Sequence, residues 1–203
     1  MENMVNSAIH RMYYWLKLST IFVMCVLAGA ILFGAMAAIT TVVDLHATAN
    51  GNAQALSFSK SWQQFRNYLS KSYGSSLFYE GILLFLGWLL WFTSQFKGVM
   101  FLLALSVQVT FFIAVLLAFL AEARLRYYYS AGRFQDFVKL AFIQLATCPK
   151  ANVGTLLYGG LSLVVLSQYP AVVFFFGVAV WENVFHTLYR DEWIARGLIT
   201  YEN

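Results

Sequence analysis

Glu182 and His186 are the two residues of this sequence whose types and spacing come closest to a reactive pair. Side chains four positions apart share one face of a helix, so this carboxylate and imidazole could be two metal ligands or an acid–base pair. A third partner is missing from the surrounding sequence. We therefore favour a hydrogen-bonded pair with a structural role, and we predict no catalytic residue, no metal site and no cofactor.

The signatures of several enzyme classes are absent from the sequence. It contains no glycine-rich phosphate loop, no H-E-x-x-H, no G-x-S-x-G and no Cys/His cluster. The two cysteines, Cys25 and Cys148, are expected to be buried, inert thiols and not a disulfide. The chemistry of this chain is therefore expected to lie in its contacts with other molecules.

The composition indicates a membrane protein. Hydrophobic residues make up 61% of the 203 residues and charged residues only 11%, against about 25% charge in a soluble domain. Three stretches without charge, 18–43, 98–121 and 151–181, exceed the roughly 18 residues that mark a membrane-spanning candidate. The net charge of +4 then reflects basic cytoplasmic loops and no nucleic-acid binding. We predict an all-α, multi-pass protein of the cell membrane.

A bundle of about five transmembrane helices fits the apolar stretches best, as one membrane domain over residues 1–203. The predicted spans are 14–40, 75–96, 98–121, 152–167 and 171–189. The first apolar stretch is longer than the roughly 7–15 residues of a signal-peptide core, so we expect it to be retained. The stretch 151–181 is too long for one crossing of a core of about 30 Å, and Pro170 in "SQYP" predicts the turn that divides it.

The distribution of Lys and Arg predicts an N-out/C-in orientation. Ten of these residues then lie on the inner side and three on the outer side, as the enrichment of basic residues in cytoplasmic loops requires. The three outer residues are Arg11, Lys17 and Lys97.

Two segments on the inner side are predicted to form amphipathic cytoplasmic helices. Each carries an apolar stripe at helical spacing and a basic opposite face, which suits a helix in the membrane interface or in a partner's groove. The first stripe is Phe58, Trp62, Phe65 and Leu69; the second is Phe134, Phe137, Val138, Ala141 and Leu145.

Polar residues within the predicted spans are the other place to look for function, because they are costly in lipid. They are Glu80, Ser106, Gln108 and Thr110. We interpret them as groups that hydrogen-bond between helices, and keep a transport pathway as the alternative. A stripe of small residues in the first span, Ala30, Gly34 and Ala38, predicts close helix packing, within the chain or against a partner.

Arginine and tyrosine are concentrated in "EARLRYYYSAGRFQDF", between two apolar stretches. Both residue types are typical of the cytoplasmic end of a transmembrane helix, where they anchor it in the interface. We expect this segment to contact lipid or a partner subunit. The residues assigned to this interface are Arg66, Arg124, Arg126, Tyr127, Tyr128, Arg133 and Lys139.

Several segments, in order along nearly the whole chain, resemble the YesL-like family of small membrane proteins from Gram-positive bacteria. "AGAILFGAMAA" (28–38) is similar to the end of the family's first span, with Gly29 in place of a proline and Leu32 in place of a threonine; Gly34 could still provide a break there. "SFSKSWQQFRNYLSKSYG" and "RLRYYYSAGRFQDFVKLAFIQLATCPKAN" resemble its two cytoplasmic segments. The resemblance implies no enzymatic activity. Family members are often encoded beside carbohydrate ABC transporters, which implies an accessory role in sugar import.

We therefore expect a non-catalytic accessory membrane subunit of a bacterial carbohydrate ABC importer. Its expected partners are membrane lipids and the permease, with the nucleotide-binding subunit as a further candidate and no small-molecule substrate of its own. The alternative is a small stand-alone transporter or channel, in which Glu80, Ser106, Gln108 or Thr110 would line a hydrated cavity. An intramembrane enzyme using Glu182 and His186 would need a third polar group within hydrogen-bond reach.

Overall fold

The computed structural model describes residues 2–29, 34–49, 51–129 and 132–197, and the described chain is helical, without strands. The elements follow in the order α1 (Glu2–Ala28), α2 (Ala35–Ala49), α3 (Phe58–Thr93), α4 (Val99–Tyr128), α5 (Phe134–Thr147), α6 (Pro149–Gln168), α7 (Pro170–Val172), a π-helical turn (Val173–Gly177) and α8 (Val178–Ala195). Five segments are long and apolar enough to cross a membrane: Asn6–Ala28, Phe58–Thr93, Val99–Tyr128, Pro149–Gln168 and Pro170–Ala195. The predicted all-α class is confirmed, and a multi-pass membrane protein is indicated.

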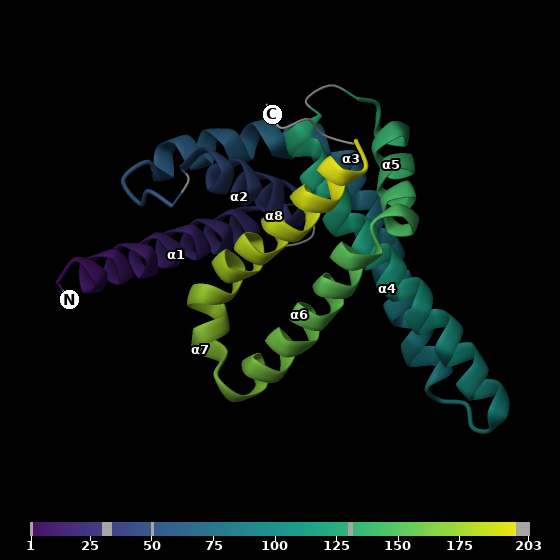
Figure 1. Ribbon diagram of the computed structural model, residues 1–203. Helices are drawn as coiled ribbons and strands as arrows, with labels where there is room; N and C mark the ends of the chain where they lie inside the picture. Colours follow the sequence, from purple (N-terminus) through teal and green to yellow (C-terminus); the bar gives the residue numbers. More distant parts are fainter. Residues whose placement is uncertain (1, 30–33, 50, 130–131, 198–203) are drawn as a thin grey trace.

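Two helical hairpins project from the rest of the molecule (Figure 1). We call residues 80–114, from α3 and α4, the first arm, and residues 156–178, from α6 to the start of α8, the second arm. Thr93 is the one buried residue of the first arm, and the second arm has none. Met100 is 80% exposed and Leu157 71% exposed. Apolar surface of this extent needs a lipid or protein environment, because water would penalise it strongly.

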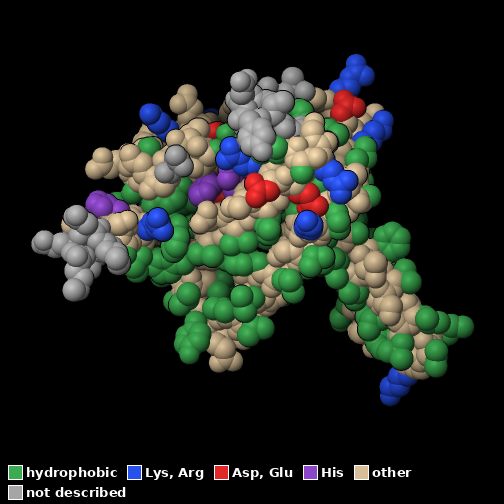
Figure 2. All heavy atoms as spheres, viewed as in Figure 1, with side chains coloured by type: hydrophobic (Ala, Val, Ile, Leu, Met, Phe, Trp, Pro, Cys, Tyr) green, Lys and Arg blue, Asp and Glu red, His purple; other side chains and the backbone are tan. Residues whose placement is uncertain are grey.

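The charged residues gather outside the arms. We call this part of the chain the base. It holds twelve of the thirteen Lys and Arg residues, and Lys97 in the turn at the far end of the first arm is the exception. Figure 2 shows the same separation, with blue and red side chains over the upper part and green surface along both arms. The molecule is therefore polar at one end and apolar along two projections.

The segment 14–40, predicted as a single span, is divided in the structure. Helix α1 ends at Ala28, α2 begins at Ala35, and the two helices pack side by side across the base (Figure 1). Gly29 and Gly34 make this return possible, because a Cβ added at Gly29 would lie 2.4 Å from Cα of Gly34. Two glycines let the backbones touch, which a continuous apolar pattern does not reveal.

Helix α3 also differs from the prediction, which separated an amphipathic helix from a span at 75–96. The structure has one helix of 36 residues from Phe58 to Thr93. Gly74 lies at the expected boundary, but a glycine disfavours a helix interior by only about 1 kcal/mol relative to alanine and does not stop it. Helix α4 likewise continues to Tyr128, beyond the predicted end at residue 121. Both helices therefore run from an arm into the base without a break.

The second arm turns where "SQYP" predicted it. Helix α6 ends at Gln168, Tyr169 leaves helical geometry with φ −136° and ψ 68°, and Pro170 is the first residue of α7. Proline suits a first helical position, because the N–H that it lacks would have no partner there. The π-helical turn that follows is held from across the hairpin, since the Tyr158 hydroxyl donates to the carbonyl oxygen of Gly177 at 3.1 Å.

Candidate functional site

Three charged residues near the end of α4 organise the region where the arms meet the base. Glu122 and Arg126 are four positions apart and share a face of α4, whereas Arg124 points to the other side. Packing around α4 buries Glu122 and Arg124 almost completely, at 0% and 2% exposure. Buried charges need partners, and the two faces of α4 find different ones.

Arg124 forms an ion pair with Glu182 of α8. Its Nη2 lies 3.4 Å from Oε2 of Glu182, and both side chains are buried to 3% exposure. The guanidinium also lies over aromatic rings of α8, 4.8 Å from the ring centre of Phe185 and 5.0 Å from that of Tyr189. Cation–π attraction strengthens when water is excluded. Arg124 therefore links α4 to α8 inside the molecule. The contact with lipid or a partner that the sequence predicted for Arg124 does not fit this buried position.

Arg126 connects α4 to α3 and α5. Its guanidinium donates to Oε1 of Glu122, with Nη2 at 2.7 Å, and Nη1 donates to the backbone oxygen of Lys71 at 3.1 Å. A further donation reaches Ser75, and the Phe137 ring of α5 lies 4.5 Å from the guanidinium carbon. Arg126 is thus fixed on several sides by residues of three helices.

Tyr14, His46 and His186 bring α1, α2 and α8 together. The Tyr14 hydroxyl and Nδ1 of His46 are 3.0 Å apart, and the rings of His46 and His186 meet edge to face with centres 5.6 Å apart. Burial lowers the pKa of His46 below its usual 6.5, because a charged imidazole loses hydration there. The neutral imidazole of His46 is therefore the form that packs in this contact.

The predicted Glu182–His186 pair is divided between two partners. Glu182 binds Arg124 and His186 packs on His46, and no hydrogen bond joins the two in the structure. Among the described residues there is no group of three or more His, Cys, Asp or Glu side chains placed to hold a metal ion. Glu182 does have a polar neighbour within reach, the Arg124 guanidinium. This neighbour is an ion-pair partner and does not complete an acid–base site.

Asp44 joins α2 to the first half of α3. Its Oδ2 accepts hydrogen bonds from Nε2 of Gln64 at 3.0 Å and from the Tyr68 hydroxyl at 3.1 Å. Burial raises the pKa of the Asp44 carboxyl. These contacts were not predicted from the sequence, because the first span was expected to end at residue 40 and no packed helix was expected before Phe58.

The polar residues of the first arm mostly bond within the arm. Nε2 of Gln108 donates to Oγ1 of Thr93 at 2.7 Å, which joins α4 to α3 as interhelical hydrogen bonding predicts. Ser106 and Thr110 are exposed and bond to carbonyl oxygens one turn earlier. Glu80 is half-buried, and neither carboxylate oxygen has a hydrogen-bond partner among the described residues. None of these four residues lines the cavities described below.

The remaining predicted residues lie in different environments. Arg66, Arg133 and Lys139 are exposed on the base, and Tyr127 and Tyr128 are half-buried. Of the packing stripe, Ala30 lies outside the described residues, while Gly34 and Ala38 are buried in the α1–α2 return and do not form a face of one long helix.

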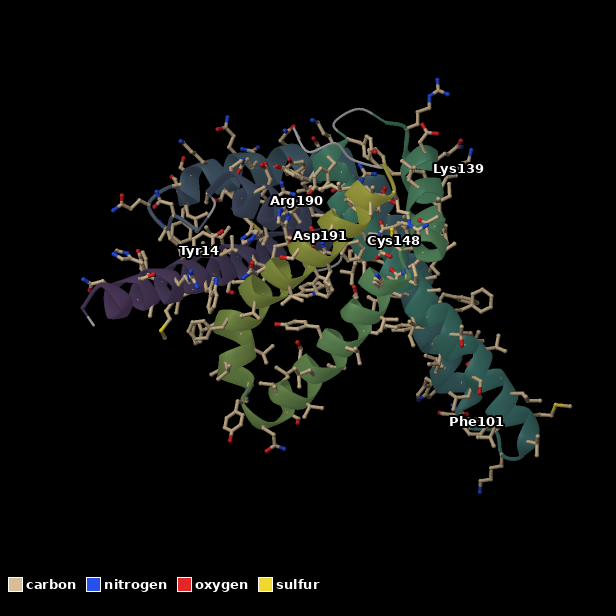
Figure 3. All side chains as sticks on the ribbon, in the orientation of Figure 1. Tyr14, Phe101, Lys139, Cys148, Arg190 and Asp191 are labelled. Atoms are coloured by element: carbon tan, nitrogen blue, oxygen red, sulfur yellow. The ribbon has the colours of Figure 1, made fainter. Side chains whose placement is uncertain are left out.

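Cys25 and Cys148 are free and buried, as expected, and burial raises the pKa of Cys148. Figure 3 shows Lys139, Arg190 and Asp191 on the base and Phe101 near the far end of the first arm.

An apolar groove lies between the part of α4 that belongs to the base and the helices of the second arm. Its cavity volume is about 540 Å³, and its walls come from α4, α6 and the start of α8. Leu116 and Leu120 of α4, Trp181 of α8, and Gly159, Gly160 and Leu163 of α6 are among the residues that line it. A Cβ added at either glycine would meet nothing within 4 Å, so this part of α6 is open to the approach of another backbone. We call this cavity the arm groove.

The fold and these sites define an all-helical protein of multi-pass membrane character, with charged contacts joining two apolar arms at a polar base. Comparison of the chain with protein-family models, with curated proteins and with solved structures finds no match. The resemblance to the YesL-like family therefore stays a prediction from the sequence motifs.

Proposed function

We propose that this chain is a non-catalytic accessory subunit of a bacterial carbohydrate ABC importer in the cell membrane, and that a transmembrane helix of the permease occupies the arm groove. The motif resemblance to the YesL-like family supports the class of partner. The arm groove carries the proposal, because it is an open, apolar, glycine-lined surface between membrane-spanning helices.

The orientation follows from the separation of charge. With the arms in the membrane, the twelve Lys and Arg residues of the base lie on one side and Lys97 alone on the other, which favours a cytoplasmic base. The contact of Tyr14 with His46, and of Lys17 with the carbonyl oxygen of Ala53 at 3.0 Å, places the early part of α1 beside the residues that follow α2. We therefore revise N-out/C-in to an orientation with both ends of the chain on the cytoplasmic side.

A transmembrane helix is the partner that fits this groove best. Its lining is almost wholly apolar, and in lipid such surfaces associate through close packing more than through hydrophobic burial. Gly159 and Gly160 supply the small side of that packing, and Leu163 and Trp181 supply larger flanking side chains. A partner helix would contact α4, α6 and α8 at once, so binding would also set the angle between these helices.

The exposed basic residues of the base supply a second contact. Arg66 lies on α3, Arg133 precedes α5 and Lys139 lies within α5, all on the side of the molecule assigned to the cytoplasm. Acidic loops of the permease, or the nucleotide-binding subunit, would be attracted there. Such exposed pairs steer association and contribute little affinity individually.

Affinity purification in a mild detergent tests the proposal. The tagged chain should recover subunits of a carbohydrate permease, and Gly160→Leu should abolish that recovery by filling the groove. Gly87→Leu is the matched control, because Gly87 is also a helical glycine of an arm with open space around it but lies outside the groove. Recovery of the chain alone, or equal recovery with both variants, would contradict the proposal.

A further inference from the structure

A second cavity, of about 340 Å³, opens on the base between α3, the end of α4 and α5. We call it the basic pocket. Lys71 and Tyr68 of α3 line one side, Arg126 and Tyr127 of α4 another, and Gly132 and Phe137 the third. In contrast to the arm groove, its lining combines two cations, Lys71 and Arg126, with three phenols, Tyr68, Tyr127 and Tyr129.

Arg126 is held in this pocket before any ligand arrives. Glu122 accepts from Nε and Nη2, and the carbonyl oxygen of Lys71 accepts from Nη1. Phe137 supports the guanidinium carbon at 4.5 Å. A guanidinium has five N–H groups, and Glu122, Ser75 and Lys71 use four of them, so among the described residues one N–H of Nη1 has no acceptor. Pre-organised donors lose little entropy when they bind an oxyanion.

Lys71 adds the second positive charge. Its side chain is exposed, and among the described residues its ammonium makes no ion pair. The donation from Arg126 to the Lys71 backbone keeps this turn of α3 against the end of α4, so both cations border the same cavity. Tyr127 and Asn67, which also line the pocket, carry an O–H and N–H donors.

Two carboxylates bond to side chains that line the pocket, Glu122 to Arg126 and Asp44 to Tyr68. Glu122 is fully buried and its Oε1 is bound by Arg126. Asp44 is held by Gln64 and by the hydroxyl of Tyr68, so Tyr68 stands between that carboxylate and the pocket. The lining that an incoming ligand meets is therefore positive and rich in donors.

We propose that the basic pocket binds a phosphate group. Lysine and arginine beside the Tyr127 hydroxyl and the Asn67 amide match the charge and the acceptor oxygens of a phosphate ester. Basic pockets between helices on the cytoplasmic side are suited to lipid headgroups. An anionic phospholipid and a soluble phosphate present the same chemistry to this pocket. The proposal is independent of the permease contact, because the basic pocket and the arm groove share no residue.

Native mass spectrometry of the purified full chain tests this with two sets of probes. In the first set, phosphatidylglycerol or phosphatidylcholine is added to the detergent-solubilised chain, and we expect one phosphatidylglycerol to be retained in preference. In the second set, inorganic phosphate or glycerol 1-phosphate is titrated against that lipid. If the soluble phosphate displaces the lipid, or binds while no lipid is preferred, the ligand of the pocket is a soluble phosphate. If the lipid is retained throughout the titration, the ligand is the lipid headgroup.

Lys71→Gln provides the residue-level test, with Lys60→Gln as control. Lys60 is exposed on the same face of α3, three turns earlier, and does not line the pocket. Loss of one lysine near a phosphate is expected to weaken binding by about fivefold, and Lys60→Gln should leave it within about twofold. Equal weakening by both variants, or a wild-type chain with neither a lipid preference nor phosphate binding, would overturn the proposal.

Discussion

The Tyr14 hydroxyl lies 3.0 Å from Nδ1 of His46, although the two residues are 32 positions apart in sequence. A helix running from Tyr14 without a turn would carry His46 to the opposite side of a bilayer, because 32 residues rise about 48 Å. The contact instead places α1 and α2 side by side, with Gly29 against Gly34 at the turn. This return brings the early part of α1 to the base, where the other positive charges lie.

Cysteine labelling tests the resulting orientation. Lys97→Cys should react with a membrane-impermeant maleimide in intact cells, whereas Arg11→Cys and Arg66→Cys should react only after permeabilisation. Lys97 lies in the turn between the arm helices, while the other two lie on the base. The native Cys25 and Cys148 are buried and provide a low background. Labelling of Arg11→Cys in intact cells would restore the N-out orientation.

The α1–α2 return predicts an unusual sensitivity at Gly29. Gly29→Ala should destabilise the protein by about 1–3 kcal/mol, as overpacking typically does, because the added Cβ would lie 2.4 Å from Cα of Gly34. Gly74→Ala is the control, since its Cβ meets nothing within 4 Å and alanine favours a helix. Thermal unfolding in detergent measures both. A neutral Gly29→Ala variant would mean that the two helices do not pack as closely as described.

The sequence predicts the helical class and most of the apolar segments, but not how they return on themselves. Hydropathy finds the arms because their side chains are apolar on all sides, and Pro170 marks a turn that its chemistry requires. A break at Gly34 was left open, but the segment 14–40 was predicted as one span, because two glycines in an apolar stretch fit both a straight packed helix and a tight return. Contacts across the return, such as Tyr14 with His46 and Lys17 with Ala53, distinguish the two.

The partners of the buried charges could not be predicted from the sequence either. The sequence placed Arg124 and Arg126 together at a helix end and predicted a surface role for both. Their actual partners depend on which face of α4 each occupies and on which helices pack there, and Glu182 is 58 positions away from Arg124. Interhelical bonding of Gln108 was predicted correctly in kind, although its partner Thr93 required the hairpin geometry.

Removing one member of the Arg124–Glu182 ion pair should be strongly destabilising. Arg124→Gln leaves the Glu182 carboxylate buried without its cation, a change that typically reduces the free energy of unfolding by about 3–5 kcal/mol. The double variant Arg124→Gln/Glu182→Gln should recover much of that loss, since no charge remains. Arg133→Gln, at an exposed position, should be close to wild type. Additive losses in the double variant would show that the two side chains do not interact.

Acid should weaken the contact between α1, α2 and α8. Burial holds the pKa of His46 below 6.5, so the unfolded chain takes up a proton in a pH range where the folded chain does not. Stability contributed by the neutral ring is therefore present above pH 6.5 and is lost as the pH falls toward the folded-state pKa. Asp44 acts in the opposite sense, because burial raises its pKa and acid relieves the desolvation of its carboxylate.

The unfolding temperature should accordingly drop between about pH 7.5 and about pH 5.5, and the drop should shrink in His46→Gln. A glutamine amide retains a hydrogen-bond partner for Tyr14 without titrating. His10→Gln, on an exposed part of α1, is the control and should keep the full drop. An identical pH dependence in wild type and His46→Gln would exclude this histidine as the cause.

Site-specific photo-crosslinking from the arm groove tests the central claim most directly. A photoreactive amino acid at Leu163 faces the groove, whereas the same group at Leu157, an equally exposed leucine of α6, lies outside the cavities described. In cells, Leu163 should cross-link to a carbohydrate permease subunit and Leu157 should not. Cross-links to lipid alone from Leu163, or the same permease yield from both positions, would contradict the account.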